Sequence, residues 1–109
     1  MPFDEGLAER LGEIIPNRSD LKETRMFGGF GYLLDGKMCV GIHKDTLIIR
    51  VGVENAEQIL QEPNVRPMDF TGKVMKGWAT IEPEALEEDS DLQRYCQLAI
   101  DFVETLPKK

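Results

Sequence analysis

Two cysteines and one histidine are the side chains of this sequence best suited to nucleophilic or metal chemistry. Cys39 and Cys96 lie far apart, and no C-x-x-C pair gives either one the spacing of a redox or zinc site. His43 follows Cys39 by four residues, about 13 Å along a strand, so that strand cannot hold both on one metal. The pattern favours two reduced core thiols and a structural or surface histidine. An enzyme that uses Cys39, Cys96 or His43 stays open as a third hypothesis, because Cys96 could approach His43 in the fold.

Two further segments come near known ligand motifs without completing them. Gly28-Gly29-Phe30-Gly31 contains a G-x-G, but it lacks the third glycine of a dinucleotide fingerprint, and the residues after it resemble a strand instead of a helix. The acidic residues 87–91 lack the spaced ligands and the glycine of an EF-hand loop. We therefore predict a turn or bulge at the glycines, a solvated helix cap at the acids, and no catalytic residue, cofactor or metal.

Aromatic and methionine side chains gather in the middle of the chain. The aromatics could form a base-stacking platform, but the pattern of an RNA-recognition motif is absent, so core packing is the better interpretation. The methionines could line an interaction groove, although filling a core is their commoner use. The residues concerned are Phe27, Phe30, Tyr32, Phe70 and Trp78 for the first set, and Met26, Met38, Met68 and Met75 for the second.

The net charge of −7 lies at the two ends of the chain. Residues 1–21 carry −3 and residues 77–109 carry −5, whereas residues 22–76 carry +1. Binding to duplex DNA requires clustered cations, so the overall charge disfavours it. A local basic patch stays possible if folding gathers five residues of the middle segment: Lys22, Arg25, Arg50, Lys73 and Lys76.

Hydrophobic periodicity predicts the elements that would position these side chains. Residues 3–15 show an apolar stripe at helical spacing and end at Pro16. Three strands should follow, at 24–27, 30–34 and 37–43, with Asp35-Gly36 as a type I′ turn between the last two. In the strand at 37–43, alternation places Met38 on one face and Cys39, Gly41 and His43 on the other. A further strand is expected at 46–51.

In the second half of the chain we predict helices and one strand. A short helix should span 54–60, and a strand should span 74–81 around Trp78. Between them, Pro67 and Gly72 argue against a long central strand over 64–73. One turn is expected at 84–88, and a helix capped by Ser90 or Asp91 should run to about residue 106.

Grouped strands with flanking helices indicate an α+β fold. We predict one domain over residues 1–109, with an antiparallel meander of four to five strands between N- and C-terminal helices. No apolar run approaches the roughly 20 residues that span a bilayer, and the acidic N-terminus does not resemble a secretion signal. We expect a cytoplasmic protein, monomeric or paired as a homodimer through an exposed hairpin edge.

Residues 25–38 read R-M-F-G-G-F-G-Y-L-L-D-G-K-M. This segment resembles the signature R-x-M-F-G-G-x-G-x-x-x-x-G-x-M of the TfoX N-terminal domain family, with the arginine one residue closer to the methionine. Residues 47–51 resemble the strand that follows this hairpin in the family, and Phe70, Met75 and Trp78 fall in a segment that resembles its later block. The resemblance implies an antiparallel sheet flanked by helices and a link to regulation of DNA uptake and transformation genes. Full-length members of the family carry a second, helical domain, and we expect this chain to be a stand-alone copy of the first. The resemblance implies no catalytic residue.

The leading hypothesis is a small non-enzymatic regulatory or adaptor domain that binds a protein partner in transcription or competence regulation. Direct nucleic-acid binding is the alternative. The candidate interaction residues are Arg25, Met26, Phe27, Gly28, Gly29, Gly31, Arg50 and Trp78.

Overall fold

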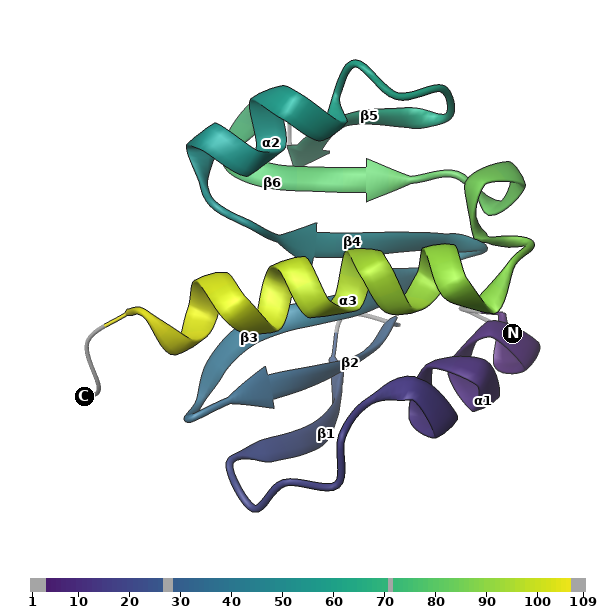
Figure 1. Cartoon of the computed structure of the whole chain (residues 1–109), viewed down its shortest axis with the longest axis vertical. Helices are drawn as coiled ribbons and strands as arrows, with labels where there is room; N and C mark the ends of the chain where they lie inside the picture. The colour runs from purple at the N-terminus through teal and green to yellow at the C-terminus, as the bar shows by residue number, and fades with distance from the viewer. Residues whose placement is uncertain (1–3, 27–28, 71, 107–109) are drawn as a thin grey trace.

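The computed structural model describes residues 4–26, 29–70 and 72–106 (Figure 1). The elements are α1 (Glu5–Ile14), β1 (Leu21–Met26), β2 (Gly29–Leu34), β3 (Lys37–His43), β4 (Thr46–Arg50), α2 (Val53–Ile59), β5 (Val65–Phe70), β6 (Lys73–Ile81), a 3-10 turn η1 (Pro83–Leu86) and α3 (Asp89–Glu104). Apart from β5 and shifts of a few residues at element ends, these are the elements that periodicity predicts.

The strands form one antiparallel sheet of six strands in the order β1-β2-β3-β4-β6-β5. The α+β class is confirmed, and the predicted count of four to five strands was low. The additional strand is β5, in the segment where Pro67 argued against a central strand. Proline is tolerated there because β5 is an edge strand, whose outer side needs no N–H donor.

All three helices lie on one side of this sheet (Figure 1). Figure 1 shows α3 in front of β3 and β4, with α1 beside it, and α2 in front of β6. The core between the layers is apolar, and its fully buried side chains include Leu11, Ile49, Ile81 and Leu92. The opposite side of the sheet therefore has no second layer within the described part of the chain.

Local signals determine the hairpin and the first helix as predicted. Asp35 and Gly36 have φ angles of 51° and 80°, in the left-handed region that a type I′ turn requires. Asp4 caps α1 by accepting a hydrogen bond from the backbone N–H of Leu7 at 3.2 Å. The long helix begins at Asp89, slightly before the expected cap at Ser90 or Asp91.

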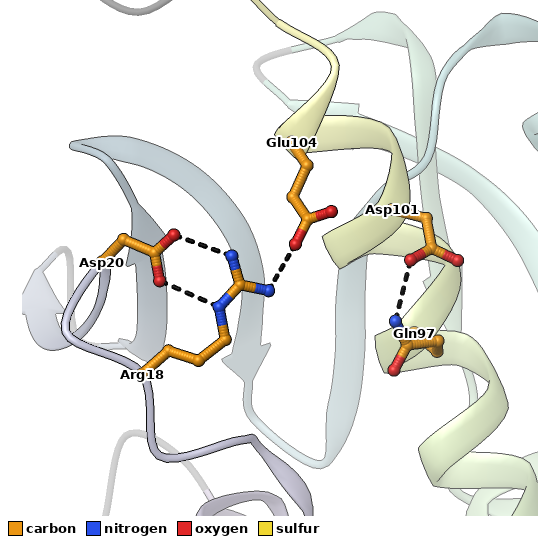
Figure 2. Close-up of polar contacts among 5 residues, drawn as sticks. All are labelled: Arg18, Asp20, Gln97, Asp101 and Glu104. Carbon is orange, nitrogen blue, oxygen red and sulfur yellow. Dashed lines mark hydrogen bonds and ion pairs between the residues drawn. The ribbon is translucent and has the colours of Figure 1, made fainter.

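Arg18 ties the loop after α1 to the end of α3 (Figure 2). Its guanidinium donates to both carboxylate oxygens of Asp20, at 3.0 and 2.7 Å, and to Glu104. The hydrogen bonds that Arg18 donates to Asp20, and then to Glu104, raise the pKa of Arg18 above its ordinary value. Figure 2 also shows Gln97 donating to Asp101 at 2.8 Å, along the same face of α3.

A second arginine ties α3 to the loop between α2 and β5. Arg94 donates to both carboxylate oxygens of Glu62, at 3.1 and 2.9 Å, and Tyr95 donates its hydroxyl to Glu62 at 2.6 Å. The hydrogen bond from Arg94 is the main reason that the pKa of Glu62 lies below its usual range. Both ends of the sheet are thus attached to the one long helix.

Gly52 fixes the exit of the chain from β4 into α2. Its φ and ψ of 88° and 158° fall in a region that only glycine adopts readily. The backbone N–H groups of Val51 and Gly52 both donate to the carbonyl of Gly77, at 2.9 and 3.0 Å. A Cβ at Gly52 would lie 2.6 Å from the ring of Phe102 in α3.

We predict that Gly52→Ala lowers the free energy of unfolding by at least about 3 kcal/mol, because it combines backbone strain with overlap against Phe102. Gly36→Ala is the matched control, since Gly36 also has a positive φ but a Cβ there meets no atom within 4 Å. We expect it to cost about 1 kcal/mol. Chemical denaturation measures both, and equal losses would contradict the packing role given to Phe102.

Candidate functional site

The uncovered face of the sheet is hollowed into a groove of about 440 Å³. Its floor is a single transverse row of residues, one from each strand, that are paired by the strand register. Thr24 pairs with Gly31, Gly31 with Gly41, Gly41 with Ile48, Ile48 with Thr80, and Thr80 with Arg66. We call this set of six residues and the space above it the groove.

Two facing glycines leave the floor without side chains on β2 and β3, and the terminal methyl of Met38 lies over them. A Cβ on Gly31 would lie 2.4 Å from the carbonyl oxygen of Val40 and 3.0 Å from the Cα of Gly41, so the backbones of β2 and β3 leave no room for one. A Cβ on Gly41 would instead meet the terminal methyl of Met38, at 2.6 Å. A flexible side chain can move away from such a contact, whereas a paired strand cannot.

Methionines and a tryptophan rise around this floor. Met38, Met68 and Met75 line the hollow together with Trp78. The sequence left open whether the methionines fill a core or line a groove, and the structure places these three in the groove. Met26 belongs to β1, but its side chain lies outside the described part of the chain. Met75 is 37% exposed, which makes it one of the large apolar side chains most open to solvent.

A bulge decides which residues of β3 face the groove. The pairing of β2 with β3 shifts between Tyr32 and Leu33, so that Met38 pairs with Leu33 and Cys39 is the additional residue. The alternation predicted for this strand, with Cys39 beside His43 and Met38 on the other face, was therefore wrong. Met38 lines the groove with His43, while Cys39 is buried.

Two cations flank the apolar part of the groove. The guanidinium of Arg50 lies 5.7 Å from the ring centre of Trp78, its cross-strand partner. Lys22 alternates with Thr24 and so projects to the same side of the sheet. No described carboxylate forms an ion pair with either of these two side chains. Arg66, at the end of the row, is held by Glu82.

The structure brings together half of the candidate interaction residues that the sequence offered. Gly29, Gly31 and Trp78 line the groove, and Arg50 stacks beside them. Arg25 lies on the opposite side of β1, where its guanidinium is 5.8 Å from the ring of Phe30. The side chain of Met26 and the residues Phe27 and Gly28 lie outside the described part of the chain.

The other predicted groupings are divided between the two faces. Of the five candidate basic residues, Lys22 and Arg50 face the groove side, Arg25 faces the helix side, and Lys73 and Lys76 are exposed on β6. The aromatic set is divided too, because Tyr32 packs against the core and edge to face with Phe30 at 5.7 Å, while Trp78 lines the groove. Phe30 belongs to the buried core and also borders the groove. The side chain of Phe70 is outside the described part.

The two thiols lie in the core and not in the groove. Cys39 and Cys96 are both buried, and burial raises the pKa of each thiol to about 12. A thiol in such surroundings is a poor nucleophile at neutral pH. His43 is exposed and lines the groove, so the sheet lies between it and Cys96 of α3. Within residues 4–26, 29–70 and 72–106, no three histidine, cysteine or acidic side chains gather as metal ligands.

Several groove residues could not be identified from the sequence. Gly41, Ile48 and Thr80 carry no local motif, and their meeting depends on the pairing of β4 with β6, which are separated by α2 and β5. The alternation of small and large residues in 37–43 is the one signal that could have indicated a hollow at Gly41.

Comparison with known proteins gives one family. The family model described as TfoX N-terminal domain matches residues 13–103 of this chain. The match covers β1 to β6, and with them the whole groove, as well as most of α3. No curated protein and no solved structure gives a significant match. In the described part of the chain, no helix has the length and apolar character needed to cross a membrane.

We predict that both cysteines of the native protein react slowly with iodoacetamide at neutral pH, and rapidly once the protein is denatured. Since the folded state raises both pKa values from 9.0 to about 12, it holds these protons more strongly than the unfolded state. The contribution of the two protonated thiols to the free energy of unfolding is complete below about pH 9 and is lost as the pH rises toward 12. The double variant Cys39→Ala, Cys96→Ala should lose less stability over this range, and an equal loss would contradict the assignment.

We also predict that Gly31→Ala lowers the free energy of unfolding by about 3 kcal/mol, because a paired strand must move. Gly41→Ala should cost less than about 1 kcal/mol, since only the end of Met38 must turn aside. Urea titration compares the two variants. Similar losses would show that the two glycines do not differ as the geometry requires.

Proposed function

The chain belongs to the TfoX N-terminal domain family, and we propose that it is a small non-enzymatic regulatory domain. It acts through protein–protein contacts in transcription or competence regulation, in the cytoplasm. The groove is the contact surface.

The observation that carries this proposal is the apolar groove on a sheet face that no described element covers. Contiguous exposed apolar surface on a folded domain marks an interaction site. Methionine adapts its shape to a partner, and tryptophan and arginine are enriched among the residues that dominate binding energy. Met38, Met68, Met75, Trp78 and Arg50 supply this combination on one face.

The absence of catalysis is supported by the state of the candidate nucleophiles. Both thiols are buried with raised pKa values, on the far side of the sheet from His43. A Cys–His pair needs direct contact between the two groups. The groove offers shape and apolar area for binding, and its polar lining consists of threonines together with His43, Arg66 and Asp69.

Affinity capture from a lysate of the source organism tests the proposal, with two glutamate variants compared to the wild type. Met75→Glu places a charge at the groove, and Val53→Glu places the same charge on α2, where Val53 is 51% exposed. We expect a specific protein that is lost with Met75→Glu and retained with Val53→Glu.

Two outcomes would contradict the proposal. One is a captured protein that both variants retain equally, because the groove would then not be its binding surface. The other is recovery of nucleic acid alone, released by moderate salt, since phosphate contacts give steep salt dependence. That result would favour direct nucleic-acid binding, with Lys22 and Arg50 as the first candidates.

A further inference from the structure

We propose that the groove receives one amphipathic α-helix of the partner, with apolar side chains along one face and carboxylates beside them. This inference rests on the proposed protein contact and adds the kind of element that makes it.

The pairing of backbone hydrogen bonds in the sheet favours a helix over an extended segment. The groove lies on a face of the sheet, where the N–H and C=O groups of the inner strands are already paired with neighbouring strands. An extended segment lying over this apolar floor would find no backbone partners there, and unpaired buried backbone groups are costly. A helix satisfies its backbone internally and presents only side chains to the floor.

The length of the floor row matches a helix of ordinary length. The floor row crosses all six strands, and five strand spacings amount to about 24 Å. A helix rises 1.5 Å per residue, so a helix of about 16 residues spans the row. The backbone floor has no side chain of its own at Gly31 and Gly41, where the terminal methyl of Met38 lies over both glycines, and Trp78 also lines the groove. An apolar side chain of the helix packs against Met38 above the two glycines.

The cations beside the groove favour a helix that carries carboxylates. Lys22 and Arg50 stand on the groove side and have no ion-pair partner among the described carboxylates. Lys73 and Lys76 are exposed on the same strand as Trp78. Of the acidic residues, only Asp69 lines the groove. A helix that carries Asp or Glu beside its apolar face therefore complements this surface.

Selection from a phage library of random 18-residue peptides tests the inference on the whole chain. We expect enriched peptides with apolar residues at i, i+3 or i+4, and i+7, flanked by acidic residues. A central proline in such a peptide should weaken binding about tenfold or more, because it breaks the helix. Fluorescence anisotropy measures these affinities.

Variants of the domain locate the binding. Gly41→Val displaces the end of Met38 from its place over the floor, and Arg50→Glu reverses one flanking charge. We expect either change to weaken the selected peptides about tenfold, and Val53→Glu on α2 to leave them unchanged. Circular dichroism confirms that each variant is folded.

Several results would overturn the inference. Enriched peptides with period-two alternation, insensitivity to the central proline, or equal binding to Gly41→Val would each exclude a helix in the groove. Failure to enrich any peptide, together with binding of anilinonaphthalene sulfonate that Gly41→Val abolishes, would identify a site for small apolar anions instead.

The experiments distinguish a wrong helix-binding inference from a wrong proposed function. A lysate protein that depends on Met75 but contacts the domain through a non-helical segment would remove the helix and keep the regulatory contact. Helical peptides that bind the groove, with no groove-dependent protein in the lysate, would do the reverse.

Discussion

The close approach of β2 and β3 at Gly31 and Gly41 is the constraint on which the surface depends. Because a Cβ on Gly31 would lie 2.4 Å from the carbonyl oxygen of Val40, any larger residue at this position would force the two paired strands apart. The pairing sets the register of β3, and the bulge beside it turns Met38 toward the groove. Gly31 thus permits the close pairing of β2 and β3, and Gly41 leaves room for the terminal methyl of Met38 on the open face.

The two faces of the sheet differ in role: the helix-covered face forms the core, and the open face carries the groove. Helices α1, α2 and α3 cover one side of the sheet, and Arg18 and Arg94 tie distant segments to α3 (Figures 1 and 2). The buried apolar side chains of strands and helices form one core cluster. The groove side contributes less to that core, which leaves its methionines and Trp78 available to a partner.

Features set by neighbouring residues could be predicted from the sequence. The turn at Asp35-Gly36, the amphipathic helices and the strand around Trp78 all follow from local patterns. The additional strand β5 could not be predicted, since Pro67 is unfavourable in a central strand and only the sheet order shows that β5 is an edge. The groove could not be predicted either. Gly41, Ile48 and Thr80 meet only because β4 pairs with β6, and these two strands are separated in sequence by α2 and β5. Arg25 and Arg50 are both arginines in predicted strands, and nothing in the sequence distinguishes them. In the structure they lie on opposite faces of the sheet.

The central claim is that the open sheet face, and not the helical side, is where this domain meets its partner. The most direct measurement is a map of backbone amide chemical shifts, recorded with and without a captured partner or a selected peptide. The account predicts that the largest changes fall on Thr24, Gly31, Gly41, Ile48 and Thr80, in one row across the sheet. Changes concentrated on α1 and α3, with these five amides unmoved, would contradict it.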